Sequence, residues 1–108
     1  SQDAGFIVFE VYSHETIIIK DNKIQAIGMV NGPKISPDGK KVVFMILQDD
    51  GHQITSGNIS YWNSVTGETH SLISDSKIIA MNPIWGNNNV IYFADFLSGA
   101  INATKVKE

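Results

Sequence analysis

The sequence contains no cysteine and no arginine, and each absence excludes classes of protein. Without cysteine there can be no disulfide framework, cysteine-ligated zinc, iron–sulfur cluster or thiol catalysis. The eight basic residues are all lysine and are outnumbered by eleven acids, so the net charge is −3. Nucleic-acid binding depends on a basic patch, so we expect no nucleic-acid partner. No apolar run approaches the roughly 18 residues of a membrane span, and we expect no span.

Patterns typical of catalytic and metal sites are also missing. The histidines His14, His52 and His70 lack metal-ligand spacing, and no Gly-x-Ser-x-Gly elbow occurs. Residues 49–51 lack the spacing of a calcium loop, and residues 86–89 lack the Gly-Lys-Ser/Thr end of a phosphate loop. We therefore expect a protein that is not an enzyme and that uses no cofactor or metal.

The composition favours β-structure. Sixteen isoleucines and eight valines stand against three leucines, and β-branched side chains suit a pleated surface better than a helix. Turn residues recur at short intervals, as at residues 31–33, 37–39 and 66–67, with strand-length apolar runs between them. A chain of 108 residues is long enough for one domain with a real core. The sequence predicts a single all-β domain over residues 1–108.

An internal repeat runs through this domain. Three segments recur in the same order 50–54 residues later. They are residues 9–16, 21–27 and 33–44, which resemble residues 62–69, 75–81 and 83–93. Self-similarity at a fixed period is the pattern of a repeat architecture, in which stacked units bury one another's faces.

The turn Ser36-Pro37-Asp38-Gly39 carries a family resemblance. Pro fixes φ, Asp bonds the backbone ahead and Gly supplies a positive φ, so the four residues predict a tight turn. With residues 40–44 and 58–69, this turn resembles a TolB-type β-propeller repeat, in which it joins the first two strands of a blade. Residues 83–86 resemble the start of the next blade, although residues 86–89 replace the family's Pro-Asp-Gly turn. The resemblance implies antiparallel four-stranded blades, about two per chain.

The family's strand order divides the chain into three parts, each with its expected strands. The partial blade 6–26 has strands 6–12 and 16–20; the complete blade 27–74 has strands 28–35, 41–47, 58–65 and 68–74; the partial blade 81–108 has strands 81–85, 90–96 and 100–107. Residues 42–47 are apolar on both faces, which predicts a strand covered on both sides. In residues 58–65, Ile59 and Tyr61 share one face and Trp62 lies on the other.

About two blades are too few to close a propeller, which has roughly 4–8 blades. Three outcomes stay open: neighbouring copies complete the blades, the chain is an excerpt of a longer propeller, or nine strands fold as a two-sheet sandwich. Open sheet edges recruit other chains. We favour the first outcome, a ring or filament of copies joined by strand pairing between subunits. The assembly strand would carry Phe6, Ile7, Val8, Phe9 and Val11.

Two further sets of residues bear on function. Trp62 and Trp85 are candidates to face a ligand, which gives the alternative function of a protein- or carbohydrate-binding propeller module. Asn58 and Asn102 begin Asn-x-Ser/Thr sequences, the acceptor of N-linked sugars in secreted proteins. The sequence therefore predicts a non-catalytic, self-assembling β-repeat protein in an extracellular or periplasmic location.

Overall fold

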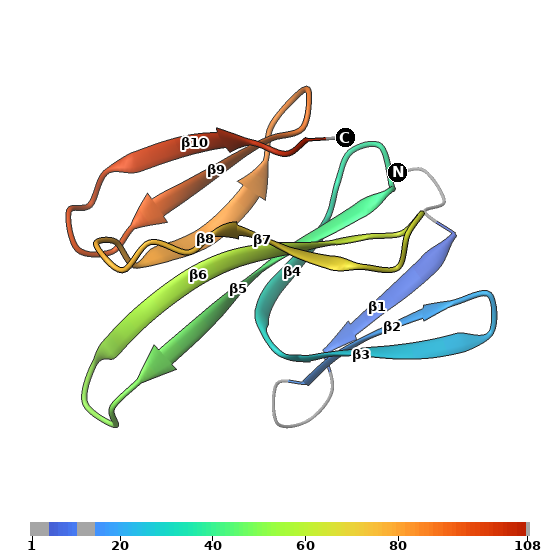
Figure 1. Cartoon of the computed structure of the whole chain (residues 1–108), viewed down its shortest axis with the longest axis horizontal. Coiled ribbons are helices and arrows are strands. Elements are labelled where there is room, and N and C mark those ends of the chain that lie inside the picture. The colour runs from blue at the N-terminus through green and yellow to red at the C-terminus, as the bar shows by residue number, and fades with distance from the viewer. Residues whose placement is uncertain (1–4, 11–14, 108) are drawn as a thin grey trace.

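A computed structural model describes residues 5–10 and 15–107, and all its regular elements are β-strands in three antiparallel sheets (Figure 1). The first sheet is formed by β1 (Phe6–Glu10), β2 (Glu15–Lys20) and β3 (Lys23–Met29). The middle sheet is formed by β4 (Asn31–Ile35), β5 (Lys41–Asp49), β6 (Ile54–Asn63) and β7 (Thr69–Ile73). The third sheet is formed by β8 (Ala80–Trp85), β9 (Val90–Asp95) and β10 (Ile101–Lys105). The all-β prediction is confirmed.

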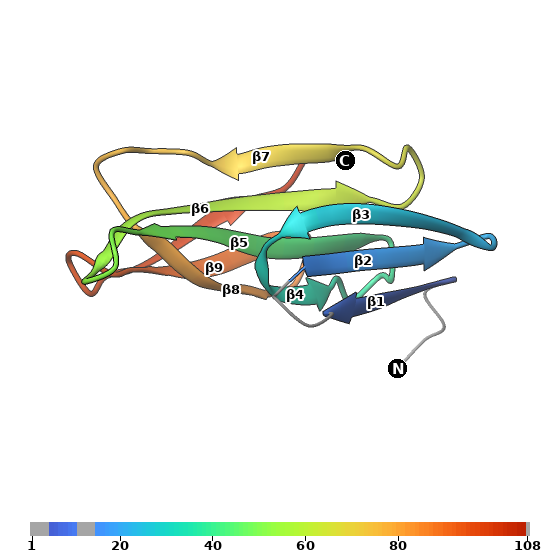
Figure 2. The ribbon, with the colours of Figure 1, turned by 90° about the horizontal axis from the view of Figure 1, so that it is seen from below.

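The middle sheet lies between the other two. In Figure 1 the three sheets follow one another across the molecule, and Figure 2 shows the strands of the first sheet in the order β3, β2, β1. Each sheet consists of consecutive strands of the chain. Three stacked sheets form where the sandwich alternative required two.

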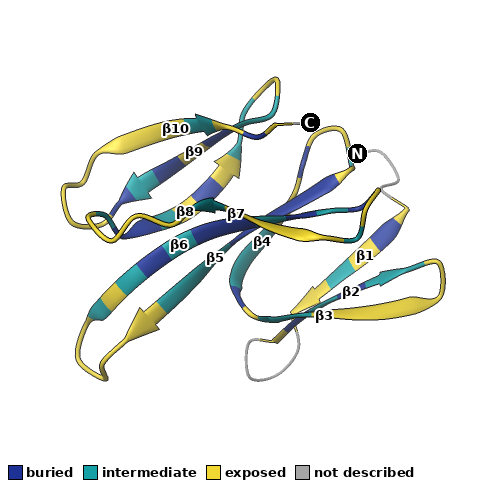
Figure 3. Ribbon diagram, viewed as in Figure 1, coloured by how far each residue is buried: buried dark blue, intermediate teal, exposed yellow. Residues whose placement is uncertain are grey.

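Two hydrophobic cores fill the spaces on either side of the middle sheet. The core shared with the first sheet contains Phe6, Ile18, Val30, Val42, Phe44 and Trp62. The core shared with the third sheet contains Val43, Ile59, Ala80, Ile91, Phe93 and Val106. Neighbouring residues of β5 thus enter different cores, which confirms that this strand is covered on both sides. Figure 3 shows the burial concentrated in β5 and β6.

The first sheet differs from the sequence prediction, which gave it two strands. Residues 23–29 form β3, a third strand that pairs with β2, whereas we expected one strand over 28–35. Asp21 and Asn22 both adopt positive φ, 53° and 61°, and this two-residue turn folds β3 straight back onto β2. The first sheet therefore extends to Met29, and β4 begins only at Asn31.

The backbone of the middle sheet closely approaches that of the third sheet at Gly57. Gly57 forms a parallel bridge with Ile79, and a Cβ added to Gly57 would lie 2.6 Å from the Ala80 carbonyl oxygen. Any side chain here would collide with backbone, so glycine permits the contact. At the other end of β8, Trp85 Nε1 donates to the Lys34 carbonyl at 2.9 Å and joins the same two sheets.

Candidate functional site

The predicted assembly strand is β1. Its described residues pair with β2, and none of the described strands lies along its other edge. Phe6 is buried and Val8 packs against the core below the first sheet. Ile7 and Phe9 point the other way, with exposed fractions of 56% and 44%. Val11 lies outside the described residues.

Ile7 and Phe9 belong to an apolar surface that we call the first outer face, the side of the first sheet away from the middle sheet. Directly paired residues of antiparallel strands share a face. The two rows of paired residues on this face are Ile7, Ile19 and Ile24, and Phe9, Ile17 and Ala26. Ile24 is 71% exposed, and beyond the second row Glu15 pairs with the exposed Met29.

The third sheet has a matching surface, the third outer face. Its rows of paired residues are Met81, Ala94 and Ile101; Ile84, Tyr92 and Ala103; and Val90 with Lys105. Ile101 is 70% exposed and Ile84 50% exposed. A shallow apolar hollow is lined by Ile84, Tyr92, Ala94 and Ile101, with Asn82 and Phe93 beside them. Both ends of the stack of sheets therefore expose apolar side chains.

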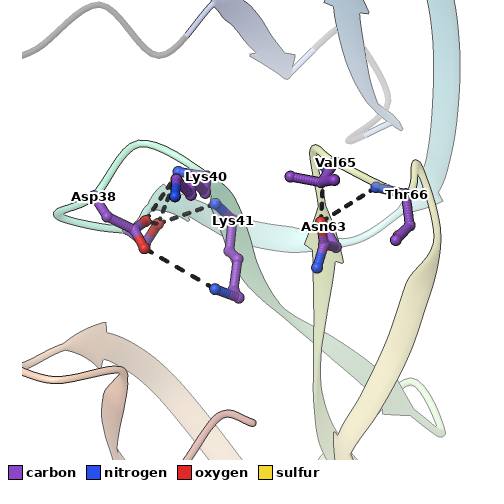
Figure 4. Close-up of polar contacts among 7 residues, drawn as sticks. Asp38, Lys40, Lys41, Asn63, Val65 and Thr66 are labelled. Atoms are coloured by element: carbon purple, nitrogen blue, oxygen red, sulfur yellow. Dashed lines mark hydrogen bonds and ion pairs between the residues drawn. The ribbon is translucent and has the colours of Figure 1, made fainter. Parts of the chain in front are cut away.

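The predicted repeat turn, Ser36–Pro37–Asp38–Gly39, joins β4 to β5 (Figure 4). The Ser36 hydroxyl donates to Asp38 Oδ1 at 2.5 Å, and the Lys40 N–H donates to the same oxygen at 2.9 Å. Gly39 has a φ of 73°. The Ser36 hydrogen bond has the largest effect and holds the pKa of Asp38 below its usual 3.8; burial opposes it, and the Lys40 N–H and the charges of Lys41 and Lys40 add to the lowering. The carboxylate is satisfied within its own turn, so the turn is structural.

Two later turns use the same chemistry. Asn63 Oδ1 accepts from the N–H groups of Val65 and Thr66 at 2.8 and 3.3 Å (Figure 4). Asp95 Oδ1 accepts from the N–H groups of Ile79 and Leu97, both at 3.1 Å.

The Asp95 turn also ties the chain entering β8 to the end of β9. The Ser98 hydroxyl donates to Asp95 Oδ2 at 2.8 Å, and the Phe96 N–H donates to the Ile79 carbonyl at 2.9 Å. The Ser98 hydrogen bond and that of Ile79 hold the pKa of Asp95 below 3.8. Asp95 is buried, so its carboxylate depends on these donors. Sequence reasoning missed this residue, although Asp95 and Gly99 have the spacing of Asn63 and Gly67.

The two tryptophans that were candidates to face a ligand are part of the protein's own packing. Trp62 is 2% exposed, and its Nε1 donates to Gln25 Oε1 at 3.0 Å. β6 turns this side chain into the core beneath the first sheet, at the floor of a groove described below. Trp85 is half-buried against the other core, and its indole N–H donates a hydrogen bond to the Lys34 carbonyl.

A groove lies between the turn that joins β2 to β3 and the turn that joins β6 to β7. Lys20, Lys23 and Gln25 line one side, and Ser64 and Gly67 line the other. Lys20 Nζ donates to the Ser64 carbonyl, and Gln25 Nε2 donates to the Gly67 carbonyl at 3.0 Å. These bonds join the two sheets across the groove.

The two predicted sugar acceptors lie in different surroundings. Asn58 is half-buried within β6 and is paired with Ile46 of β5. Asn102 is exposed on β10 and is paired with Phe93, on the opposite side of the third sheet from the third outer face. A sugar on Asn102 would leave the third outer face free.

The described part of the chain contains no cluster of three or more His, Cys, Asp or Glu side chains placed to hold a metal ion. Within that part we also find no helix with the length and apolarity needed to cross a membrane. Comparison with family models, with curated proteins and with solved structures gives no match to this chain. The two outer faces and the edge of β1 are thus the candidate functional surfaces.

Proposed function

We propose that this chain is a non-catalytic, extracellular β-repeat module that assembles with copies of itself through its two outer sheets. The observation that carries the proposal is the exposure of apolar side chains on both outer sheets. Exposed apolar patches of this kind mark interaction surfaces in proteins. Three stacked antiparallel sheets, two of them with three strands, are also what successive propeller blades of the TolB type would look like before a ring closes.

The edge of β1 is one route by which copies could join. A strand paired on one side presents N–H and C=O groups to another chain, and main-chain hydrogen bonds then supply affinity. In β1, Ile7 and Phe9 would carry side chains into the new contact. Head-to-tail joining gives a ring or a filament, depending on the rotation between subunits.

Light scattering over a range of protein concentrations tests self-assembly. We expect the mass to rise from that of one chain, 11.9 kDa, to a multiple of it. A constant mass of one chain up to millimolar concentration would overturn the proposal and favour the alternative, in which other sheets of a longer propeller or a different protein cover the outer faces.

Amide hydrogen exchange tests the β1 route separately. In an antiparallel edge strand alternate N–H groups point outward, so at low concentration residues 6–10 should exchange in an alternating pattern. If β1 pairs with another copy, the fast amides become protected as the concentration rises. Assembly without such protection would exclude β1 pairing but leave self-assembly standing.

A further inference from the structure

The outer faces have the pattern of sheets covered on both sides. An antiparallel sheet with one face in water normally alternates apolar and polar residues. In β2, Ile18 is buried in the core, yet Ile17 and Ile19 on the other side are also isoleucine. In β9, Ile91 and Phe93 are buried, while Tyr92 and Ala94 occupy the other side. Both sheets are thus built to pack on a further layer.

The two outer faces differ in the size of some of the side chains that they carry. On the first outer face the central strand, β2, carries the bulky side chains of Ile17 and Ile19. The third outer face has two small residues, Ala94, which lines the shallow hollow together with Tyr92, and Ala103, which is paired with Tyr92. Packed layers place large side chains against small ones, so the isoleucines of the first outer face can pack over the alanines of the third.

The two faces are also complementary in charge. Glu15 lies beside the rows of the first outer face, and Lys105 lies on a row of the third outer face. Stacking the first face on the third places a face with a negative charge against a face with a positive one. Stacking either face on its own copy would place charges of the same sign in one contact, and like charges repel. Charge therefore favours the contact between unlike faces.

From these observations we infer that the third outer face of one copy stacks on the first outer face of a second copy, and that this stacking makes the main contact of the assembly. The inference rests on the proposed self-assembly and names its surfaces. The partner is a second copy because the chain itself supplies both complementary faces, and because its own middle sheet already packs between two sheets of this kind. Two copies would bring six sheets together, within the roughly 4–8 blades of closed propellers.

Two lysine substitutions test the inference, one on each face. Ile24→Lys alters the first outer face and Ile101→Lys the third, at positions 71% and 70% exposed, where the single chain can accept a charge. The matched control is Val65→Lys, at a position 77% exposed in the turn after β6 and outside both faces. A lysine buried in the contact without a partner should weaken association by about 100-fold or more. The control should associate like the unaltered protein.

Mixing the two lysine variants gives the decisive measurement. Each variant alone keeps only one working face, so by light scattering each should remain a single chain. In a mixture, the intact third face of Ile24→Lys meets the intact first face of Ile101→Lys. The mixture should therefore form a species of two chains and nothing larger. A ring or filament of the unaltered protein would instead use both faces of every copy.

Other results with these variants would contradict face stacking, self-assembly or both. If the lysine variants and Val65→Lys all associate like the unaltered protein, face stacking is excluded and self-assembly stands. If either variant alone still forms pairs, the copies join through like faces or through the edge of β1, and the inference that unlike faces make the main contact is wrong. If the mixture stays at one chain, the contact between unlike faces is likewise excluded. An unaltered protein that is always a single chain contradicts both proposals.

Cysteine substitution provides a second measurement should a lysine variant fail to fold, because the chain has no native cysteine. Ile24→Cys mixed with Ile101→Cys should be joined into a two-chain product by a flexible thiol-reactive crosslinker. Ile24→Cys mixed with Val65→Cys should not give that product beyond the level of random collision. Equal yields in the two mixtures would overturn the inference.

Discussion

The ring of Phe6 meets the ring of Trp62 edge-on, with centroids 5.0 Å apart and planes inclined by 74°. This pair joins β1 to β6 and so attaches the first sheet to the middle sheet. Edge-to-face pairs of this kind contribute beyond the area that they bury. Because β1 is held through Phe6, the strand that we expected to bind another copy is also part of its own chain's core.

Replacing Phe6 should therefore destabilise the fold. We expect Phe6→Ala to lower the free energy of unfolding by about 3–5 kcal/mol, because a buried aromatic ring is lost and a cavity remains beside Trp62. Chemical denaturation followed by tryptophan fluorescence measures the loss. Ile7→Ala, at an exposed position of the same strand, is the control and should cost well under half as much in the single chain. Equal losses for the two variants would contradict the packing of Phe6.

A side chain at Gly57 should disrupt the contact between the middle and third sheets. Gly57→Ala would place a methyl group 2.6 Å from the Ala80 carbonyl oxygen, so one backbone must move. Overpacking of this kind costs about 1–3 kcal/mol, measured as a lower midpoint in thermal or chemical unfolding. The control, Thr55→Ala on the same strand, alters an exposed residue and should change stability by about 0.5 kcal/mol or less.

Asp95 should make stability depend on pH under acidic conditions. Its pKa in the folded chain lies below the usual 3.8, so the folded state favours the ionised form more than the unfolded state does. The resulting stabilisation is present above pH 3.8 and is lost as the pH falls through the folded pKa. Asp95→Asn should thus cost more stability at pH 7 than near pH 3, as measured by urea unfolding.

Asp75→Asn is the control for that comparison. Asp75 is exposed, and its carboxylate accepts one hydrogen bond, from the Lys77 N–H at 2.9 Å. The Asp95 carboxylate instead accepts from Ile79, Leu97 and Ser98. We expect the control to lose much less stability at pH 7. An Asp95→Asn variant whose deficit stays constant between the two pH values would show that the charge of Asp95 contributes nothing.

The two sugar acceptors should differ when the chain passes through a eukaryotic secretory pathway. We expect the folded product to carry a sugar on the exposed Asn102 and none on the half-buried Asn58. Mass spectrometry of the unaltered protein beside Asn102→Gln and Asn58→Gln checks this result. Only Asn102→Gln should remove mass, and a sugar found on Asn58 would contradict this prediction.

The sequence predicts the middle and third sheets well because strong local patterns lie in them. The apolar run of β5 and the alternation of Ile59 and Trp62 in β6 specify which side chains enter each core, and both predictions are confirmed. Pro37 and Gly39 likewise specify a turn before β5. These elements depend on residues close together in the chain, so a single sequence contains the information.

The first sheet and the surroundings of Trp62 were harder to predict. Residues 21–27 resemble residues 75–81 in sequence, but the positive φ of Asp21 and Asn22 folds the earlier segment into a hairpin strand. No local pattern shows that Gln25, 37 residues before Trp62, will accept its indole N–H. The outer faces also emerge only when the register of three strands is known, since Ile7, Ile19 and Ile24 are distant in sequence.

The arrangement of consecutive strands within each sheet has a consequence for folding. Every hydrogen-bonded strand pair joins neighbours in the chain, so each ladder closes over a short loop at a small cost in chain entropy. Proteins dominated by such short-range pairings reach their native state faster than other β proteins of similar size. We expect hairpins to appear early on the folding pathway, with the docking of one preformed layer on another as the slow step.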